Sequence, residues 1–308
     1  MNAILFPGQG SQIVGMGYEF YNNFKIVRDI FDSADDKLNY KISKIILEGP
    51  EKELILTQNT QPAILTVSYA IFSVLKKEFN FNFKSTKYFA GHSLGEYSAL
   101  VCSKSLEFND ALFLLFERGK AMQAAVPVGE GCMIAILGSK IEEVDIFIKQ
   151  LNTKGVCEIA NDNAEGQTII SGDINSVESL KNILKVNKKK FIPLNVSAPF
   201  HCKLMQPAAM AMREKIDSIN FKKPEFDIIS NVTSKPENDQ DKIKKLLIDQ
   251  IFSTVRWRES MINMSKEKTT DFIEIGPGKV LSGMVKRTLK DINSFSINSI
   301  DDMKKVIG

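Results

Sequence analysis

The segment YFAGHSLGEYSAL, residues 88 to 100, constrains the fold of this chain more than any other segment. It places Ser93 between two glycines in a G-x-S-x-G pattern, after a short apolar run and before residues at helical spacing. Where such a pattern joins a strand to a helix, the glycines permit a tight turn and leave the serine hydroxyl uncrowded. The free N–H groups at the start of the helix also favour a negative charge there. The pattern predicts a nucleophilic serine, with a plain structural turn as the alternative.

Strands and helices alternate along residues 1 to 125, which is typical of a parallel sheet covered by helices on both faces. Apolar periodicity predicts strands at 3 to 6 and 88 to 90, and helices at 18 to 38, 60 to 79, 94 to 102 and 110 to 125. Thr60-Gln61-Pro62 is expected to begin the second of these helices, because proline is favoured in a first turn. Asn109 and Asp110 are expected to cap the fourth.

The order of predicted strands and helices changes between residues 126 and 197. The pattern there predicts strand 132 to 137, helix 140 to 151, strands 156 to 161 and 167 to 172, helix 174 to 187 and strand 190 to 196. This βαββαβ order is the ferredoxin-like arrangement. We therefore expect a small domain at 126–197, inserted into a large domain made of residues 1–125 and 198–308. Predicted helices at 203 to 219, 239 to 252 and 256 to 265, and strands at 226 to 231 and 271 to 275, complete the large domain.

Composition limits the function classes. A chain of 308 residues suffices for one large domain that carries a smaller one. A net charge of +3 is too small to indicate nucleic-acid binding by itself, and none is expected. Four cysteines without a Cys-x-x-Cys pair favour reduced thiols and argue against a zinc site. We find neither a signal-peptide pattern nor the roughly 18 apolar residues of a membrane span, and we expect a cytoplasmic protein without a membrane partner.

A serine nucleophile needs a base, and histidine is the usual base near neutral pH. The chain has two histidines. His92 adjoins Ser93 on the same turn, where neighbouring side chains diverge, so we expect it to pack or hydrogen-bond beneath the turn. His201 is then the base by elimination, and it follows the inserted segment, where a cleft between domains is expected. A structural histidine at position 201 is the alternative.

Motifs from one end of the chain to the other form an ordered set. They are FPGQGSQ (6–12), TQPAIL (60–65), GHSLGEYSAL (91–100), ERGKAMQ (117–123), NDN (161–163), GQTIISG (166–172), SAPFHC (197–202) and EIGPGKVL (274–281). This set resembles the malonyl-CoA:acyl carrier protein transacylase family. The resemblance implies an α/β-hydrolase-like large domain with a parallel sheet, interrupted by a ferredoxin-like small domain.

The resemblance also implies a ping-pong acyl transfer. Ser93 attacks the thioester of malonyl-CoA while His201 accepts the hydroxyl proton, which leaves a malonyl-serine ester and free CoA. The phosphopantetheine thiol of an acidic, transiently bound acyl carrier protein then takes the malonyl group, to supply fatty acid synthesis. Since the CoA thioester is a substrate, no cofactor and no metal are expected.

Further roles follow from the same resemblance. The backbone N–H groups of Gln9 and Leu94 form the oxyanion hole. The backbone carbonyl of Gln250 orients His201 in place of the usual acid. Arg118 holds the malonyl carboxylate with its guanidinium fork, which favours malonyl over acetyl.

The resemblance assigns six more residues to the substrate cleft, although each is alternatively only structural. They are Met122, Asn161, Asn163, Ser197, Phe200 and Val280. Phe200 matches the bulky residue of malonyl-selecting relatives.

Other classes of protein stay open. A serine esterase or thioesterase shares the elbow and His201, but it normally offers a carboxylate partner and has no need of Arg118. A non-catalytic binding subunit would keep the fold without the reactive set. A polyketide pathway uses the same reaction in a trans-acting acyltransferase. Basic clusters at 185 to 190, 221 to 224, 241 to 245 and 285 to 290 would steer an acidic carrier protein, or are simply solvated surface.

Overall fold

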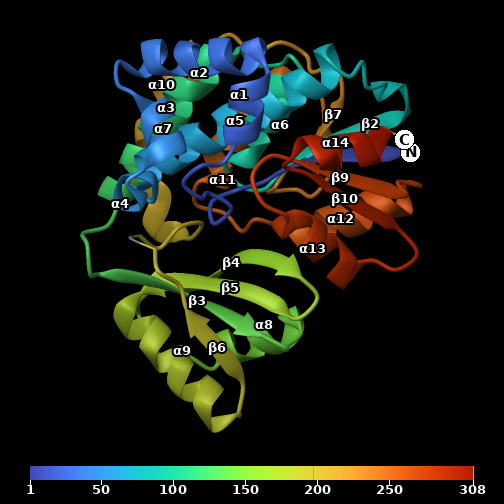
Figure 1. Ribbon diagram of the computed structural model, residues 1–308. Coiled ribbons are helices and arrows are strands. Elements are labelled where there is room, and N and C mark those ends of the chain that lie inside the picture. Colours follow the sequence, from blue (N-terminus) through green and yellow to red (C-terminus); the bar gives the residue numbers. More distant parts are fainter. Residues whose placement is uncertain (197, 308) are drawn as a thin grey trace.

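The computed structural model describes residues 1–196 and 198–307 (Figure 1). A larger part contains both termini, and a smaller part with its own sheet lies beside it. The architecture is mixed α/β, with one mainly parallel sheet and one separate antiparallel sheet. Among the described residues, no helix combines the length and the apolar character that crossing a bilayer needs.

The larger part is built on a six-stranded sheet in the order β10-β9-β1-β2-β7-β8. Its strands are β1 (Asn2–Phe6), β2 (Thr86–Gly91), β7 (Asp227–Ile229), β8 (Pro236–Glu237), β9 (Asp271–Ile275) and β10 (Asn293–Ile297). Neighbouring strands are parallel except β7 and β8, which are antiparallel. Phe6 pairs with Gly91, so the two central strands end side by side, and the loops that follow them begin at the same edge of the sheet.

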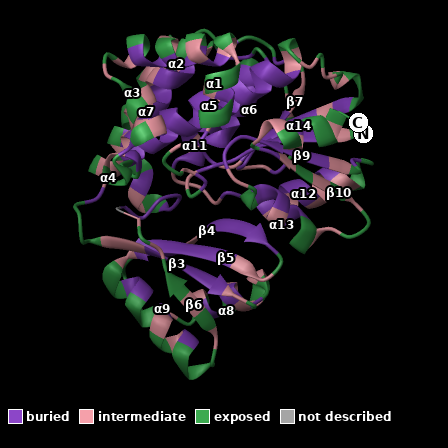
Figure 2. Ribbon diagram, in the orientation of Figure 1, coloured by how far each residue is buried: buried purple, intermediate pink, exposed green. Residues whose placement is uncertain are grey.

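Helices cover both faces of this sheet, because its central strands are apolar on both sides. On one face, Ile4 and Phe89 share a core with α2 (Lys25–Leu38), α5 (Thr57–Lys77), α6 (Gly95–Cys102), α7 (Phe108–Ala124), α10 (Gln206–Ser218) and α11 (Gln240–Gln250). On the other face, Leu5 and Phe272 pack with α12 (Trp257–Lys266) and α13 (Val280–Thr288). Figure 2 shows α5 buried along most of its length, between the sheet and the outer helices. The larger part also contains the α-helices α1 (Tyr18–Asn23), α3 (Ile42–Glu48), α4 (Glu51–Leu54) and α14 (Ile300–Ile307).

The smaller part contains a four-stranded antiparallel sheet in the order β4-β5-β3-β6. Its elements are β3 (Gly131–Leu137), α8 (Ile141–Lys149), β4 (Cys157–Ala164), β5 (Gln167–Asp173), α9 (Ile174–Val186) and β6 (Lys190–Pro193). Successive side chains of a strand point to opposite faces. Ile134 and Ile136 therefore pack against α8 and α9, whereas Met133 belongs to the main core. The N–H of Asp162 also donates to the carbonyl of Val255 at 3.0 Å, which joins β4 to the larger part.

Several predicted boundaries are wrong, because the true boundaries carry little local signal. α5 begins at Thr57, so Pro62 lies inside this helix rather than in its first turn, and the N-cap, Leu56, makes no side-chain hydrogen bond. α7 begins at Phe108, before the expected cap. Phe24, in extended conformation, divides the predicted helix 18–38 into two, and β6 ends at Pro193. The sequence does not predict α3, α4, α14, β8 or β10.

Candidate active site

Ser93 lies on a sharp turn between β2 and α6. Its backbone has a φ of +53°, an uncommon value for a residue with a side chain, and its N–H donates to Asn231 Oδ1 at 2.7 Å. Both flanking glycines are required by close backbone approaches. A Cβ at Gly95 would lie 2.3 Å from the carbonyl oxygen of Phe6, and a Cβ at Gly91 would lie 1.9 Å from the carbonyl oxygen of Gly95. The backbone geometry of the turn therefore requires glycine at both positions.

We expect Gly95→Ala to lower the free energy of unfolding by about 2 to 3 kcal/mol, because its methyl group would overlap the β1 backbone. Gly283→Ala is the matched control, since a Cβ at this position in α13 meets nothing within 4 Å. Alanine there should be neutral or slightly stabilising, because it has the higher helix propensity. Urea unfolding of both variants measures the effect. Equal changes in the two variants would contradict the close approach.

His201 reaches the Ser93 hydroxyl from the segment that follows the small sheet. Its Nε2 lies 2.8 Å from Ser93 Oγ, and its Nδ1 lies 2.8 Å from the carbonyl oxygen of Gln250. Because a carbonyl only accepts, Nδ1 carries the proton and Nε2 accepts from the serine. Burial, and then the charge of Arg118, lower the pKa of His201 to about 3. The imidazole is thus neutral near pH 7, the state that a general base needs.

The same shift has a consequence for stability. The pKa of the folded His201 is about 3, against 6.5 for an ordinary histidine, so below pH 6.5 the unfolded chain binds a proton that the folded chain does not. The free energy of unfolding therefore falls as the pH decreases. Relative to His201→Gln, which does not titrate, the wild type should lose about 1 to 2 kcal/mol between pH 7 and pH 5. Urea unfolding at both pH values measures the difference, and a difference that did not change with pH would contradict a buried neutral histidine.

Arg118 comes from α7 and is 1% exposed. Its Nη1 donates to Gln61 Oε1 at 2.7 Å, and its Nη2 donates to Gln250 Oε1 at 2.8 Å and to Ser93 Oγ at 3.2 Å. Among the described residues, none forms an ion pair with it, and its Nε has no acceptor. Burial lowers the pKa of Arg118, because a desolvated cation is unfavourable without a counter-ion. A charged guanidinium beside a nucleophile and without a carboxylate is suited to bind an anionic acyl group.

Most of the residues that the sequence assigned to the site line one pocket of about 380 Å³ between the larger part and the small sheet. They are Gln9, Ser93, Leu94, Arg118, Met122, Asn161, Asn163, Phe200, His201 and Val280. Within the described residues, the backbone N–H groups of Gln9 and Leu94 have no acceptor, so both are free for an oxyanion. Gln250 does not line the pocket, but its backbone carbonyl contacts His201 from outside the pocket. Ser197 lies outside the described residues.

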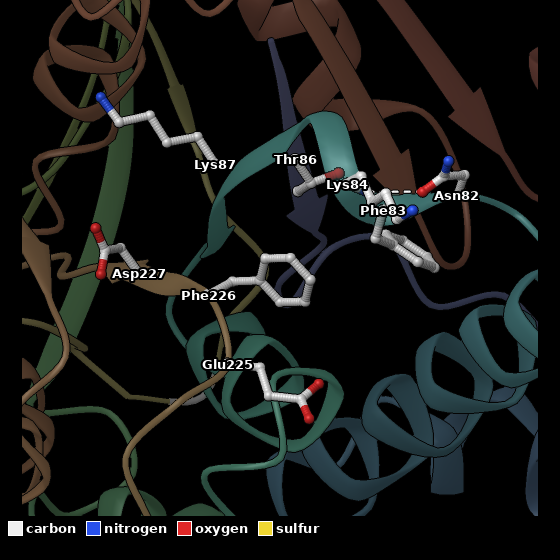
Figure 3. A pocket seen from close by; sticks show the side chains of 8 residues that line it. All are labelled: Asn82, Phe83, Lys84, Thr86, Lys87, Glu225, Phe226 and Asp227. Carbon is white, nitrogen blue, oxygen red and sulfur yellow. Dashed lines mark hydrogen bonds between the residues drawn. The ribbon is translucent and has the colours of Figure 1, made fainter.

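The size of a cavity does not identify the site. A hollow of about 540 Å³ lies at the amino ends of β2 and β7 (Figure 3). It is lined by Asn82, Phe83, Lys84, Thr86, Lys87, Glu225, Phe226 and Asp227. This set contains charged groups and rings, but no histidine beside a hydroxyl. The chemistry therefore points to the smaller pocket at Ser93.

His92 hydrogen-bonds and packs as expected from the sequence, but it also lines the pocket at Ser93 instead of lying wholly beneath the turn. Its Nε2 is 2.8 Å from Asn163 Oδ1, and its ring meets the Trp257 ring edge-on at 5.5 Å. Burial lowers the pKa of His92, which favours the neutral ring. These contacts tie the turn at Ser93 to the small sheet, where Asn163 is located.

The sequence motifs predict no role for Gln61, Glu96 or Asn231. Gln61 receives a hydrogen bond from Arg118, Asn231 receives one from the Ser93 N–H, and Glu96 accepts from the Gln250 side chain at 2.8 Å. Gln61 and Glu96 stand in quoted motifs, where a polar side chain among apolar neighbours is the available signal. No comparable signal marks Asn231.

Comparison with known proteins agrees with this geometry. The acyl transferase domain family matches residues 4–306. A malonyl CoA-acyl carrier protein transacylase of Bacillus subtilis (strain 168) is 42% identical over 99% of this chain and 96% of its own length. The chain belongs to the malonyl CoA-acyl carrier protein transacylase family.

Other relatives support the assignment to this family. The transacylase of Haemophilus influenzae is 40% identical over 99% of this chain and 97% of its own length. The crystal structure of the acyl-carrier-protein-S-malonyltransferase of Bartonella henselae matches with a TM-score of 0.96 at 41% identity, and covers 99% of this chain and 98% of that chain. A malonyl-transacylase in complex with a type II PKS acyl-carrier protein matches with a TM-score of 0.95 at 37% identity, over 99% of this chain and 98% of that chain.

Proposed function

We propose that this protein transfers the malonyl group of malonyl-CoA to the phosphopantetheine thiol of an acyl carrier protein, and so supplies fatty acid synthesis. One observation carries the proposal: a hydrogen-bonded Ser93–His201 pair shares a pocket with Arg118, which has no carboxylate partner among the described residues. The names of the relatives and the complex with a carrier protein support the same two substrates.

The first half-reaction forms the acyl-enzyme. Ser93 Oγ attacks the thioester carbonyl carbon while His201 Nε2 accepts the hydroxyl proton. The carbonyl oxygen becomes an oxyanion beside the backbone N–H groups of Gln9 and Leu94. The tetrahedral intermediate then expels the CoA thiolate, which takes the proton from the imidazolium. Malonyl-serine and free CoA result.

The second half-reaction repeats these steps with the carrier protein as nucleophile. His201 Nε2 accepts the thiol proton of the phosphopantetheine arm, and the thiolate attacks the ester carbonyl carbon. Collapse of the second intermediate breaks the bond to Ser93 Oγ, which recovers the proton from His201. The Gln250 carbonyl holds the imidazole in one tautomer throughout, but a neutral carbonyl stabilises the imidazolium less than a carboxylate would. A thioester tolerates this weaker support because it is a better acyl donor than an amide.

The acyl group is expected to lie with its carboxylate on Arg118. The guanidinium donates to three neutral oxygens, and a carboxylate is a stronger acceptor than any of them. Met122 and Phe200 give the pocket its apolar walls, while Asn161, Asn163 and the half-exposed Val280 lie around it. We assign the malonyl carboxylate to Arg118 and the reacting carbonyl to the Gln9–Leu94 side of the pocket.

Finer descriptions of the fold are part of this proposal. The strand order β4-β5-β3-β6 with antiparallel pairing supports a ferredoxin-like small domain at 126–197. The parallel sheet with its strand–turn–helix at Ser93 supports an α/β-hydrolase-like domain made of 1–125 and 198–308. The free cysteines of the chain agree with a cytoplasmic location. We propose that no cofactor or metal takes part.

A mass measurement after incubation with malonyl-CoA tests the function. The intact protein should gain one malonyl group, and peptide mapping should place this group on the peptide that contains Ser93. Added carrier protein should remove the group and carry it as a thioester. Loss of the group to water at the same rate without the carrier protein would instead indicate a thioesterase. Carrier proteins of fatty acid and polyketide systems, compared as acceptors, identify the pathway.

A further inference from the structure

The side chain of Gln250 occupies a buried position behind the Ser93 turn. Its Nε2 lies 2.8 Å from Glu96 Oε2, 3.1 Å from the carbonyl oxygen of Ser93 and 3.3 Å from Asn231 Oδ1. Its Oε1 lies on the opposite side and accepts from Arg118 at 2.8 Å. The backbone carbonyl of this residue orients His201, but the side chain has no part in that contact.

These neighbours allow only one orientation of the amide. Rotating the Gln250 amide by half a turn would place Oε1 against the three acceptor oxygens and the NH₂ group against the Arg118 guanidinium. Both new arrangements are repulsive, and the Gln250 side-chain amide would lose all of its hydrogen bonds. The acceptors on the Nε2 side therefore decide that an oxygen faces Arg118.

Glu96 is the strongest of these acceptors. It is 2% exposed, and its Oε2 accepts both from Gln250 Nε2 and from the backbone N–H of Asn231 at 3.1 Å. It forms no ion pair with any described residue, and the Gln250 amide links it to Arg118. Burial raises the pKa of Glu96 to about 7, with the hydrogen bonds of Asn231 and Gln250 and the charge of Arg118 acting in the opposite direction.

The Gln250 amide is one of the groups that hold the Arg118 guanidinium. Besides Gln250, its guanidinium contacts Gln61 and Ser93, and it lies over the Tyr97 ring at 5.9 Å. The bonds from Nη1 to Gln61 and from Nη2 to Gln250 hold the plane of the fork from two sides. A bidentate contact with a carboxylate requires this plane to be fixed, because both N–H groups must point to the same anion.

We propose that Glu96 is a positioning residue for malonyl recognition: its acceptor oxygen orients the Gln250 amide, which in turn aims the Arg118 guanidinium into the pocket. The inference rests on the proposed function, because it assumes that Arg118 binds the malonyl carboxylate. Glu96 acts here as an acceptor of hydrogen bonds. A neutral acceptor of the same shape therefore keeps the role, and an apolar side chain of the same size loses it.

Two substitutions separate the acceptor from the volume of the side chain. Glu96→Gln keeps an oxygen that accepts from both donors, whereas Glu96→Met fills the same space without one. The measured quantity is the ratio of kcat/KM for malonyl-CoA to that for acetyl-CoA, with a carrier protein as acceptor. For Glu96→Gln this ratio should stay within about threefold of the wild type. For Glu96→Met it should fall about tenfold, the size of one charge-assisted hydrogen bond.

Gln250→Met provides a second variant that does not depend on how well changes at Glu96 fold. It removes the amide that links Glu96 to Arg118 and keeps the backbone carbonyl that orients His201. It should lower the malonyl-to-acetyl ratio at least as much as Glu96→Met does. In the double variant the two losses should not add, because both break the same chain of contacts.

Three results would overturn the inference. They are equal ratios for Glu96→Gln and Glu96→Met, a parallel loss of malonyl and acetyl transfer in Glu96→Met, and an unchanged ratio in Gln250→Met. The proposed function is tested separately, on the wild-type enzyme and not on the variants. A wild-type enzyme that forms no malonyl-Ser93 contradicts the function, and removes the role of Glu96 with it.

Discussion

Ser93→Ala should form no acyl-enzyme with malonyl-CoA and should lose malonyl transfer by at least about 10⁴-fold. The reason is chemical: the oxygen that attacks the thioester and carries the malonyl group is absent, while His201 and Arg118 remain in place. Intact-protein mass after incubation with malonyl-CoA measures the covalent product, and a coupled assay of CoA release measures the rate. The fold should be kept, because the Ser93 backbone N–H still donates to Asn231.

Ser98→Ala is the matched control for this loss. Ser98 lies on α6, the helix that follows Ser93; it is fully buried, and its hydroxyl has no hydrogen-bond partner among the described residues. Its removal should leave both the acyl-enzyme and the rate near the wild-type values. A malonyl group that still appears on Ser93→Ala, or a label that maps to another residue of the wild type, would show that Ser93 is not the nucleophile.

Arg118→Ala should lower kcat/KM for malonyl-CoA by about 10³-fold, while acetyl-CoA changes far less. In the wild type, a bound malonyl carboxylate would satisfy the buried guanidinium, whereas an acetyl group leaves it without an anionic partner. The substitution removes both the attraction for malonyl and the penalty against acetyl. The ratio of kcat/KM for the two thioesters is the quantity to measure.

Two arginine variants complete this test. Arg118→Lys keeps the charge but has no planar fork to contact Gln61 and Gln250 together, so it should recover only part of the malonyl rate. Arg213→Ala removes an exposed arginine on α10 and should leave the ratio unchanged. If malonyl and acetyl transfer fell equally in Arg118→Ala, this arginine would not bind the carboxylate.

Short segments of the sequence predict much of the fold. The apolar runs at β1, β2 and β9 are found where the alternation of strands and helices predicts them. The first residues of the helices are predicted less accurately. α5 begins after Leu56, which makes no capping hydrogen bond, and α7 begins after Glu107, which makes none either. A boundary without a side-chain cap is set by packing, and packing involves residues far away in the sequence.

The site also contains some residues that the sequence predicts and others that only the structure reveals. The motifs single out Ser93, Arg118 and His201, but they give no reason for the converging side chains of Gln61, Glu96 and Asn231. Ser93 and Asn231 are 138 positions apart in the sequence, and Arg118 and Gln61 are 57 apart. Helical and strand periodicity relate only residues that are close in the sequence, so they cannot predict such pairs. A hydrogen bond between two side chains exists only after the helices that carry them have packed.

The sequence by itself determined the strand–turn–helix at Ser93, because Gly91 and Gly95 lie only four positions apart and a Cβ at Gly91 would meet the backbone of Gly95. Only the tertiary structure decided that Ser93 has a base. His201 is 108 positions away, and its ring is neutral because the fold removes it from water and places the charge of Arg118 beside it. Desolvation and charge depend on every neighbour in space, and a linear pattern contains only the neighbours along the chain.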